Sequence, residues 1–318
     1  MTRYLIVRLS RALLTLLALS FVVFAMLRLV PGDPAVLVLG PEASPQALQA
    51  LREQLGLDQP IVTQFAAWLR RAITGDLGLS LRFKEPVMPL IVERYPRTLS
   101  LVIWGSAVAI SISLVAGATS ARRNNSWIDL SITSVALLGI SVPGFWLGAL
   151  LMLAFSVHLG WLPTSGYVAP GKGVAEFLKH LVMPGTALGL AVGAVLTRMV
   201  RSSLLDVYLE PYIVAARAKG LAETTLFYRH ALRNALIPVV TLFGIHLGYM
   251  MGGTVVMEKM FAYPGIGTLI LEALFQRDYP VVQAGILSYA TTFILINLIT
   301  DVAYSAIDPR VTLAGKGR

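Results

Sequence analysis

The stretch EPYIVAARAKGLAETTLFYRHALRNALIP, residues 210–238, is the longest polar interval in the second half of the chain, and it lies between two strongly apolar segments. Pro211 can begin a helix, because its missing N–H would be unpaired in the first turn anyway. Gly220 can adopt the left-handed conformation that ends a helix. The pattern predicts a short helix over 211–219 with small alanine side chains at its centre, which another backbone can approach closely. From these features alone, a docking element and a solvated loop both remain open.

Composition places the whole chain among membrane proteins with several spans. Of its 318 residues, 56% are hydrophobic and only 14% are charged, and the mean hydropathy is +0.72. Such values lie outside the range of ordinary soluble domains. The formal net charge is +9, but the basic residues are spread among loops, which disfavours a nucleic-acid partner and is typical of loops that face anionic lipid. Because the chain has no cysteine, disulfides, cysteine-ligated metals and thiol catalysis are excluded.

Six apolar segments are long enough to cross a hydrocarbon layer about 30 Å thick. We therefore expect an all-α, polytopic membrane protein with six transmembrane helices. The first segment is predicted to be a retained helix, since no small-residue cleavage site of a signal peptide follows it. Pro143–Gly144 predicts a kink within the third. The segments are 9–30, 98–121, 130–157, 181–197, 234–257 and 279–300.

Between the first two spans lies a mixed-charge segment in which we predict a small helical extracytoplasmic region. Ser44–Pro45 and Gly56 have the residue types that begin and end a helix, and a second amphipathic helix fits 60–74. The predicted organisation is a first transmembrane helix (1–30), the extracytoplasmic helical segment (31–97), a core of five helices (98–305) with a connecting loop at 198–237, and a tail (306–318).

The distribution of Lys and Arg predicts that both termini are cytoplasmic. An even number of spans puts the two ends of the chain on one side of the membrane. The loop at 198–237 holds six basic residues, whereas the short loops at 158–180 and 258–278, on the opposite side, hold two each. Short loops rich in Lys and Arg face the cytoplasm. The polar stretch at 210–238 is therefore expected on the cytoplasmic side.

Two predicted spans carry glycines at intervals of four residues, on one helix face. Such stripes let helices approach closely in lipid. From the sequence, these glycines could serve helix packing alone or could also line a transport path. His246 is the only histidine deep in a span, and no Asp or Glu lies mid-span to complete a proton relay, so a hydrogen-bonded or path-lining role is favoured. The candidates are Gly185, Gly189, Gly193, Gly244, His246, Gly248, Met251 and Gly252.

One near match to a nucleotide-binding motif is rejected. In GYVAPGKG, residues 166–173, Gly173 replaces the Ser or Thr that would hold Mg²⁺, and no buried strand precedes the motif. The four histidines have no metal-ligand spacing with one another or with a carboxylate. We expect no ATP site, no metal site and no catalytic residue in this chain.

The blocks VAARAKGL (214–221) and HALRNALIP (230–238) resemble the cytoplasmic signature loop of binding-protein-dependent ABC importer permeases, most closely the branch for dipeptides, oligopeptides and nickel. Further blocks at 4–34, 55–81, 277–283 and 307–310 are similar to the same branch and follow in the same order. Val214 stands where the general family pattern has Glu, and the interval from Gly220 to Pro238 is longer. The peptide branch shares both departures.

This resemblance implies a transmembrane subunit that is not itself an enzyme. In similar permeases the signature loop forms a coupling helix that sits in a groove of a separate ATP-binding subunit, where ATP and Mg²⁺ are bound. The implied partners are a second, related permease chain in a heterodimer, two ATPase subunits and an extracytoplasmic solute-binding protein, in the inner membrane of a bacterium or archaeon. The residues implied to dock to the ATPase are Tyr212, Ala215, Ala216, Arg217, Ala218, Lys219, Gly220, Leu221 and Arg229. The candidate contacts on the outer side of the membrane are Glu258, Phe261, Tyr263, Arg277, Asp278 and Tyr279.

Peptides are the first substrate class expected. Nickel chelates, glutathione and other small solutes are alternatives for the same machinery. A secondary transporter driven by an ion gradient is the alternative of a different class, but it would need inverted repeats or intramembrane carboxylates, and the sequence shows neither.

Overall fold

The computed structural model describes residues 2–29, 34–40 and 42–307. Within these ranges the chain is built of helices, and the single strand-like contact is a bridge between Leu79 and Pro86. The predicted all-α class is confirmed. The predicted tail and most of the block at 307–310 lie outside the described residues.

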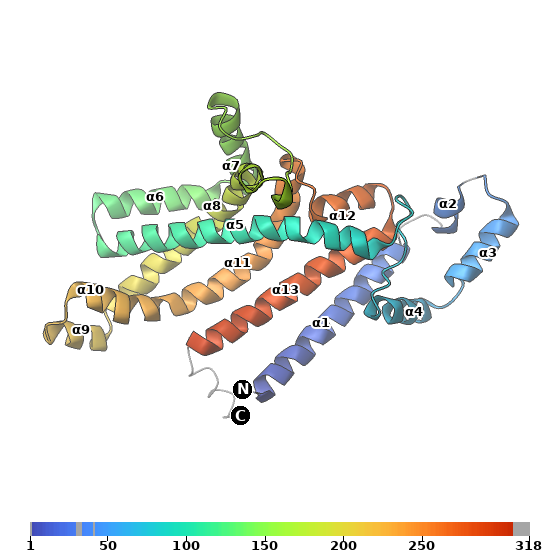
Figure 1. The fold of residues 1–318 in the computed structure, drawn as a ribbon. Coiled ribbons are helices and arrows are strands. Elements are labelled where there is room, and N and C mark those ends of the chain that lie inside the picture. Colours follow the sequence, from blue (N-terminus) through green and yellow to red (C-terminus); the bar gives the residue numbers. More distant parts are fainter. Residues whose placement is uncertain (1, 30–33, 41, 308–318) are drawn as a thin grey trace. The chain divides into compact units, whose positions relative to one another are not determined.

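The chain forms two compact units. Among the described residues, the large unit consists of Arg97–Pro264 and Leu295–Ile307, and the small unit consists of Thr2–Pro96 and Gly265–Ile294. Two long helices, α5 (Val87–Arg122) and α13 (Tyr279–Ile307), contribute residues to both units (Figure 1).

The large unit is built around α8, which is its most buried helix. Of the most apolar 18-residue window of α8, 67% of the residues are buried, more than in any other candidate span among the described residues. The sequence predicted a span only over 181–197, whereas the helix continues for several residues beyond both ends of that apolar run. The elements of this unit, besides parts of α5 and α13, are α6 (Trp127–Ser141), α7 (Gly144–Leu151), η1 (Met152–His158), η2 (Pro170–Lys172), α8 (Val174–Tyr208), α9 (Pro211–Ala218), α10 (Glu223–Thr225), η3 (Leu226–Ala231) and α11 (Leu232–Met260).

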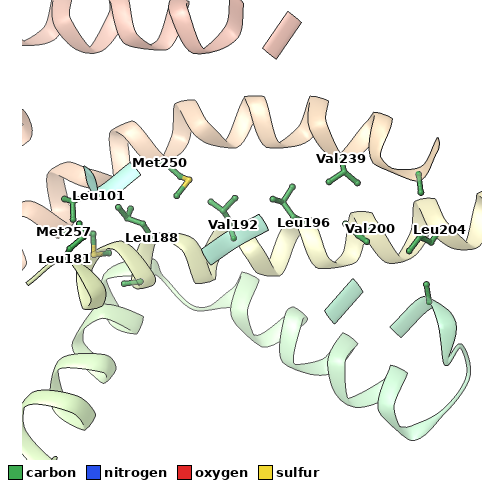
Figure 2. Close-up of a cluster of buried hydrophobic side chains, with 14 of the residues drawn as sticks. Leu101, Leu181, Leu188, Val192, Leu196, Val200, Leu204, Val239, Met250 and Met257 are labelled. Carbon is green, nitrogen blue, oxygen red and sulfur yellow. The ribbon is translucent and has the colours of Figure 1, made fainter. Parts of the chain in front are cut away.

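One hydrophobic core runs along α8 and joins it to α11. Figure 2 shows Leu188, Val192, Leu196 and Val200 following one another along α8, with Met250 on α11 facing this row. Burying each such side chain contributes about 1.5–3 kcal/mol relative to exposure in water. In lipid that driving force is largely absent between helices, so close packing matters more.

The first glycine stripe provides this close packing between α8 and α5. A Cβ atom built on Gly189 would lie 2.5 Å from the carbonyl oxygen of Gly105 and 2.8 Å from the Cβ atom of Val108. The second stripe is not uniform. Gly244 packs against Thr300 of α13, whereas a Cβ atom on Gly252 would meet no atom within 4 Å. The first stripe is therefore a helix–helix contact, whereas in the second Gly244 makes such a contact and Gly252 does not.

A matched pair of glycine substitutions tests this difference. We expect Gly189→Ala to destabilise the protein by about 1–3 kcal/mol, because its methyl group would overlap the α5 backbone. Gly252→Ala should be neutral or stabilise the helix by about 0.5–1 kcal/mol, because alanine is the better helix former and has room there. Thermal unfolding of both variants in the same detergent measures the difference, and equal losses would refute the close-contact assignment.

The predicted kink at Pro143 is confirmed, and it is sharper than expected. Val142 has extended backbone angles (φ −88°, ψ 126°), as the residue before a proline prefers. Helices α6 and α7–η1 meet there at 107°, so residues 127–158 form either a broken span or a re-entrant loop. Within the described residues, five helices are long and apolar enough to cross a membrane, and the bent pair brings the number to the six that were predicted.

The small unit contains the predicted short helices after the first span. Ser44 caps one of them by accepting a hydrogen bond from the Ala47 backbone N–H (3.2 Å), and Gly56 ends it in the left-handed conformation (φ +67°). Both roles were predicted. One helix, α12, was missed, because its apolar run is too short to span and was assigned to a loop. The elements are α1 (Thr2–Leu29), α2 (Pro34–Leu39), α3 (Pro45–Leu55), α4 (Ile61–Ile73), α12 (Ile266–Phe275) and parts of α5 and α13.

Candidate functional site

The helix predicted at the centre of the polar stretch is α9. It begins at Pro211 after an extended Glu210, and two hydrogen bonds close its C-terminal end. The Gly220 N–H donates to the Arg217 carbonyl (3.0 Å), and the Leu221 N–H donates to the Ala216 carbonyl (3.3 Å). With Gly220 at φ +78°, this is a Schellman motif. The helix and its glycine stop are confirmed, with the end one residue earlier than predicted.

Two contacts fix α9 to the rest of the large unit. Ile213 is fully buried in the same hydrophobic core as Leu204 of α8 and Phe227 of η3. The Asn234 side-chain amide at the start of α11 donates a hydrogen bond to the Tyr212 hydroxyl (2.7 Å). A movement of α9 is therefore transmitted to both α8 and α11. The sequence reasoning missed Ile213 and Asn234, because several apolar residues lie in this stretch and nothing in the sequence distinguishes Ile213 from its neighbour Val214.

The opposite side of α9 exposes apolar side chains. Val214 is 54% exposed, and Ala215 and Ala218 are exposed as well; Leu209, at the end of α8 just before this helix, is 81% exposed. A contiguous exposed apolar face is typical of a protein–protein contact. Ala216, in contrast, packs partly against the core of its own unit. Both alanines were predicted to dock, and of the two Ala215 is the more exposed.

The basic residues of the loop divide into two kinds. Arg217 forms an ion pair with Glu223 across the turn (Nε to Oε1, 2.6 Å), and this hydrogen bond raises the pKa of Arg217. The pair is solvent-exposed, so it contributes little to stability, but it ties the end of α9 to α10. Lys219 and Arg229 are exposed. All three were predicted to meet a partner, and of these Arg217 already has a partner within the loop.

A second polar centre holds α5, α6 and α8 together, and the sequence analysis did not single it out. Asp129 is buried and receives two charge-assisted hydrogen bonds from Arg201, at 2.6 and 2.7 Å. Its carboxylate also accepts hydrogen bonds from the Ser120 hydroxyl and from the Asn125 backbone N–H (3.0 Å). Arg201 lies on the part of α8 that leads into α9. The centre thus fixes the helix from which the exposed loop projects.

The predicted path residues have different environments. His246 lines an apolar cavity of about 390 Å³ whose walls come from α7, α8 and α11. Its neighbour Tyr249, with ring centroids 5.7 Å apart, lines the same cavity. Met251 is buried, and Gly252 is exposed. Among the candidate path residues, His246 therefore lies on a cavity wall.

Three of the predicted outer contacts are buried within the large unit. Glu258 is fully buried and accepts a hydrogen bond from the Thr98 hydroxyl (2.6 Å). The Tyr263 hydroxyl lies 2.9 Å from that of Ser100, and burial raises the pKa of Tyr263 to about 12. Phe261 is 2% exposed. The expectation that these side chains form a contact surface was wrong. They connect the first residues of α5 that belong to the large unit with the end of α11.

The remaining outer candidates belong to the small unit. Asp278 is buried, and its carboxylate accepts hydrogen bonds from the Ser80 hydroxyl (2.5 Å) and from the backbone N–H groups of Leu81 (3.1 Å) and Arg82 (3.2 Å). Two of the sequence blocks that carried the family resemblance, 55–81 and 277–283, therefore meet at this carboxylate. Asp278 is a structural group rather than a contact residue. Arg277 is exposed.

A family model described as "Binding-protein-dependent transport system inner membrane component" matches residues 110–313, and a model for the N-terminal part of such membrane components matches residues 1–102. The chain belongs to this family. It is a multi-pass inner-membrane permease of an ABC importer, and its family is not one of catalytic enzymes. The predicted family is confirmed.

Relatives of known name match this permease over nearly its whole length. It is 45% identical to the "Glutathione transport system permease protein GsiC" of Escherichia coli O6:H1, over 311 residues that cover 98% of this chain and 99% of the relative. It is 44% identical, with the same coverage, to the proteins of that name from Escherichia coli K12 and Shigella dysenteriae serotype 1.

Among solved structures, the permease is similar to a chain of the inward-facing MetNI methionine ABC transporter. The TM-score is 0.58 with 19% sequence identity, and the match covers 70% of this chain and 97% of the other. At this identity the likeness establishes a shared fold.

Proposed function

We propose that this permease forms half of the path of an ATP-driven importer for small peptides, with glutathione, itself a tripeptide, as the first candidate. The support is its 45% identity to permeases named for glutathione transport over 98% of the chain. The broader expectation of dipeptides and oligopeptides remains part of the proposal. Nickel is disfavoured as a bare ion, because no group of three or more His, Asp or Glu side chains able to hold a metal occurs among the described residues.

The observation that carries the coupling function is the geometry of α9. Its exposed apolar face, built on Val214, Ala215 and Ala218, fits a groove on a separate ATP-binding subunit, and its buried Ile213 links it to the transmembrane core. ATP and Mg²⁺ are then bound and used by two partner ATPase subunits. When the two ATPase subunits close, a rigid docking helix that is anchored in the core can transmit this movement to α8 and α11.

The remaining parts of the assembly follow from the same proposal. A second, related permease chain supplies the other half of the path, and an extracytoplasmic solute-binding protein delivers the substrate. Both termini and α9 lie on the cytoplasmic side, as the distribution of Lys and Arg predicts. The cavity lined by His246 and Tyr249 is part of the path, where a largely apolar wall with two polar rings would let a peptide pass without holding it.

Uptake assays with several substrates test the proposed specificity. The permease is expressed together with the partner subunits encoded beside it in cells that lack their own peptide and glutathione importers. We expect uptake of radiolabelled glutathione that is at least roughly tenfold faster than uptake of nickel ions, as a selectivity of about 1.4 kcal/mol would give. Nickel uptake without glutathione or peptide uptake would contradict the proposal.

The energy source separates this proposal from a secondary transporter. In proteoliposomes that contain the assembled complex, uptake should require ATP hydrolysis. It should persist when an uncoupler collapses the ion gradients while ATP is held constant. Uptake that stops with the uncoupler and does not need ATP would favour the ion-driven class.

A further inference from the structure

The small unit contains a cavity of about 550 Å³ that the transport function does not use. Its walls come from the last turns of α1, from α4, from the loop at 76–84 and from the first turns of α13. All of these elements lie within the small unit. The cavity therefore depends on the packing of that unit alone.

Two residues that line this cavity each hold a buried hydrogen-bonding group without a partner among the described residues. The Gln283 side-chain nitrogen and the Tyr279 hydroxyl are both buried, and neither has a hydrogen-bond partner among the described residues. Both residues line the cavity, and they lie four positions apart, on one face of α13. Gln283 is only 7% exposed. Because buried polar groups are almost always paired, the two groups indicate a bound molecule with acceptor oxygens.

The charges around the cavity indicate that this molecule is an anion. Arg28, Arg71 and Lys84 line it, and Asp76 is the one acidic residue among the lining residues. One carboxylate oxygen of Asp76 already accepts a hydrogen bond from the Gly78 N–H (2.9 Å). Three cations against one anion leave an excess of two positive charges. An anionic phosphate group is the usual partner of such a cluster.

The other walls are apolar and lie where a lipid would reach them. Phe24, Leu27 and Trp68 line the cavity, and the Arg28 guanidinium lies 4.9 Å from the centre of the Phe24 ring. The candidate span of α1 ends at Leu29, and that of α13 begins at Tyr279. Both helices therefore cross the membrane boundary at the level of this cavity. Cations near such a boundary sit at headgroup depth, with apolar side chains against the first acyl carbons.

We propose that this cavity binds one anionic phospholipid of the bilayer. The phosphate lies among Arg28, Arg71 and Lys84. The Tyr279 hydroxyl and the Gln283 amide donate hydrogen bonds to headgroup oxygens, and the first methylene groups lie against the apolar wall. This assignment depends on the membrane location of the permease and does not depend on its substrate.

Native mass spectrometry of the purified full-length chain tests the proposal. The protein is incubated with equal amounts of phosphatidylglycerol and phosphatidylethanolamine. We expect one phosphatidylglycerol to be retained in preference. The double variant R71Q/K84Q should bind it roughly tenfold or more weakly, since each basic group near a phosphate contributes about a factor of five. Arg70→Gln is the matched control, because Arg70 is exposed on the same helix but does not line the cavity, and it should bind normally.

A near-isosteric variant separates a ligand site from a merely structural one. Gln283→Met removes the unpaired donor and should weaken phosphatidylglycerol retention without lowering the melting temperature. Equal retention of the two lipids, or unchanged retention by R71Q/K84Q, would overturn the proposal. Displacement of the lipid by millimolar inorganic phosphate would also overturn it, because the site would then be one for a soluble anion.

Discussion

A permease carrying Ala215→Glu is expected to reach the membrane at normal levels and to lose ATP-driven uptake. Ala215 is exposed on α9, whose neighbouring Ile213 keeps the helix in place, so the new carboxylate has no effect on the fold. In the proposed groove it would be buried without a partner. Such a group costs on the order of 3 kcal/mol, which corresponds to a loss of uptake by roughly a hundredfold.

Two further variants make this result specific. Ala175→Glu places the same change on an exposed position in the first turn of α8 and should leave uptake unchanged. Gly220→Pro should abolish uptake too, because proline cannot adopt the φ of +78° found at this position. Membrane levels are followed by immunoblot and ATP hydrolysis by phosphate release. Normal uptake by Ala215→Glu would rule out α9 as the docking helix.

The variant Arg201→Met is expected to lower the free energy of unfolding by about 3 kcal/mol or more, since it leaves the Asp129 carboxylate buried without its cation. The side chain of Asp129 is 6% exposed and that of Arg201 27% exposed, so solvent compensates little for the loss. Thermal unfolding of the purified chain measures the effect. Arg198→Met, at an exposed position one turn earlier on α8, should change stability by no more than about 0.5 kcal/mol.

A double-mutant cycle shows whether the loss belongs to the pair. Adding Asp129→Asn to Arg201→Met removes the uncompensated charge, and we expect it to restore at least half of the lost stability. If the two single losses simply add in the double variant, the ion pair is not the source of the effect.

Features that depend on neighbouring residues could be predicted from the sequence. The caps of α3, the glycine stop of α9 and the break at Pro143 each rest on one residue type with a restricted backbone, and each was predicted. The apolar segments predicted the all-α membrane-protein class and the candidate membrane spans. The boundaries were less accurate, because α8 continues past its apolar run with residues such as Glu176 and Arg201 at its two ends.

Features that depend on distant residues could not be predicted in this way. Asp129 and Arg201 are 72 positions apart, and each alone reads as an ordinary charge at the end of a span. Glu258 and Tyr263 were taken for surface groups because polar residues beside a predicted span are usually exposed, whereas here Thr98 and Ser100 of α5 pair with them. The sequence does not distinguish Ile213 from other apolar residues. Its burial becomes apparent only in the structure, where η3 and α8 surround it.

The π-helical turn η3, between α10 and α11, has a consequence for comparing this permease with its relatives. A π turn spans one residue more than an α turn, and it falls in the interval from Gly220 to Pro238, which is longer than in the general family pattern. Because the wider turn takes up the extra residue, deleting one residue from 226–231 would let the turn revert to α geometry while the segments on either side keep nearly the same phase. A chain one residue shorter at this place could therefore keep the same side of α9 turned toward the core.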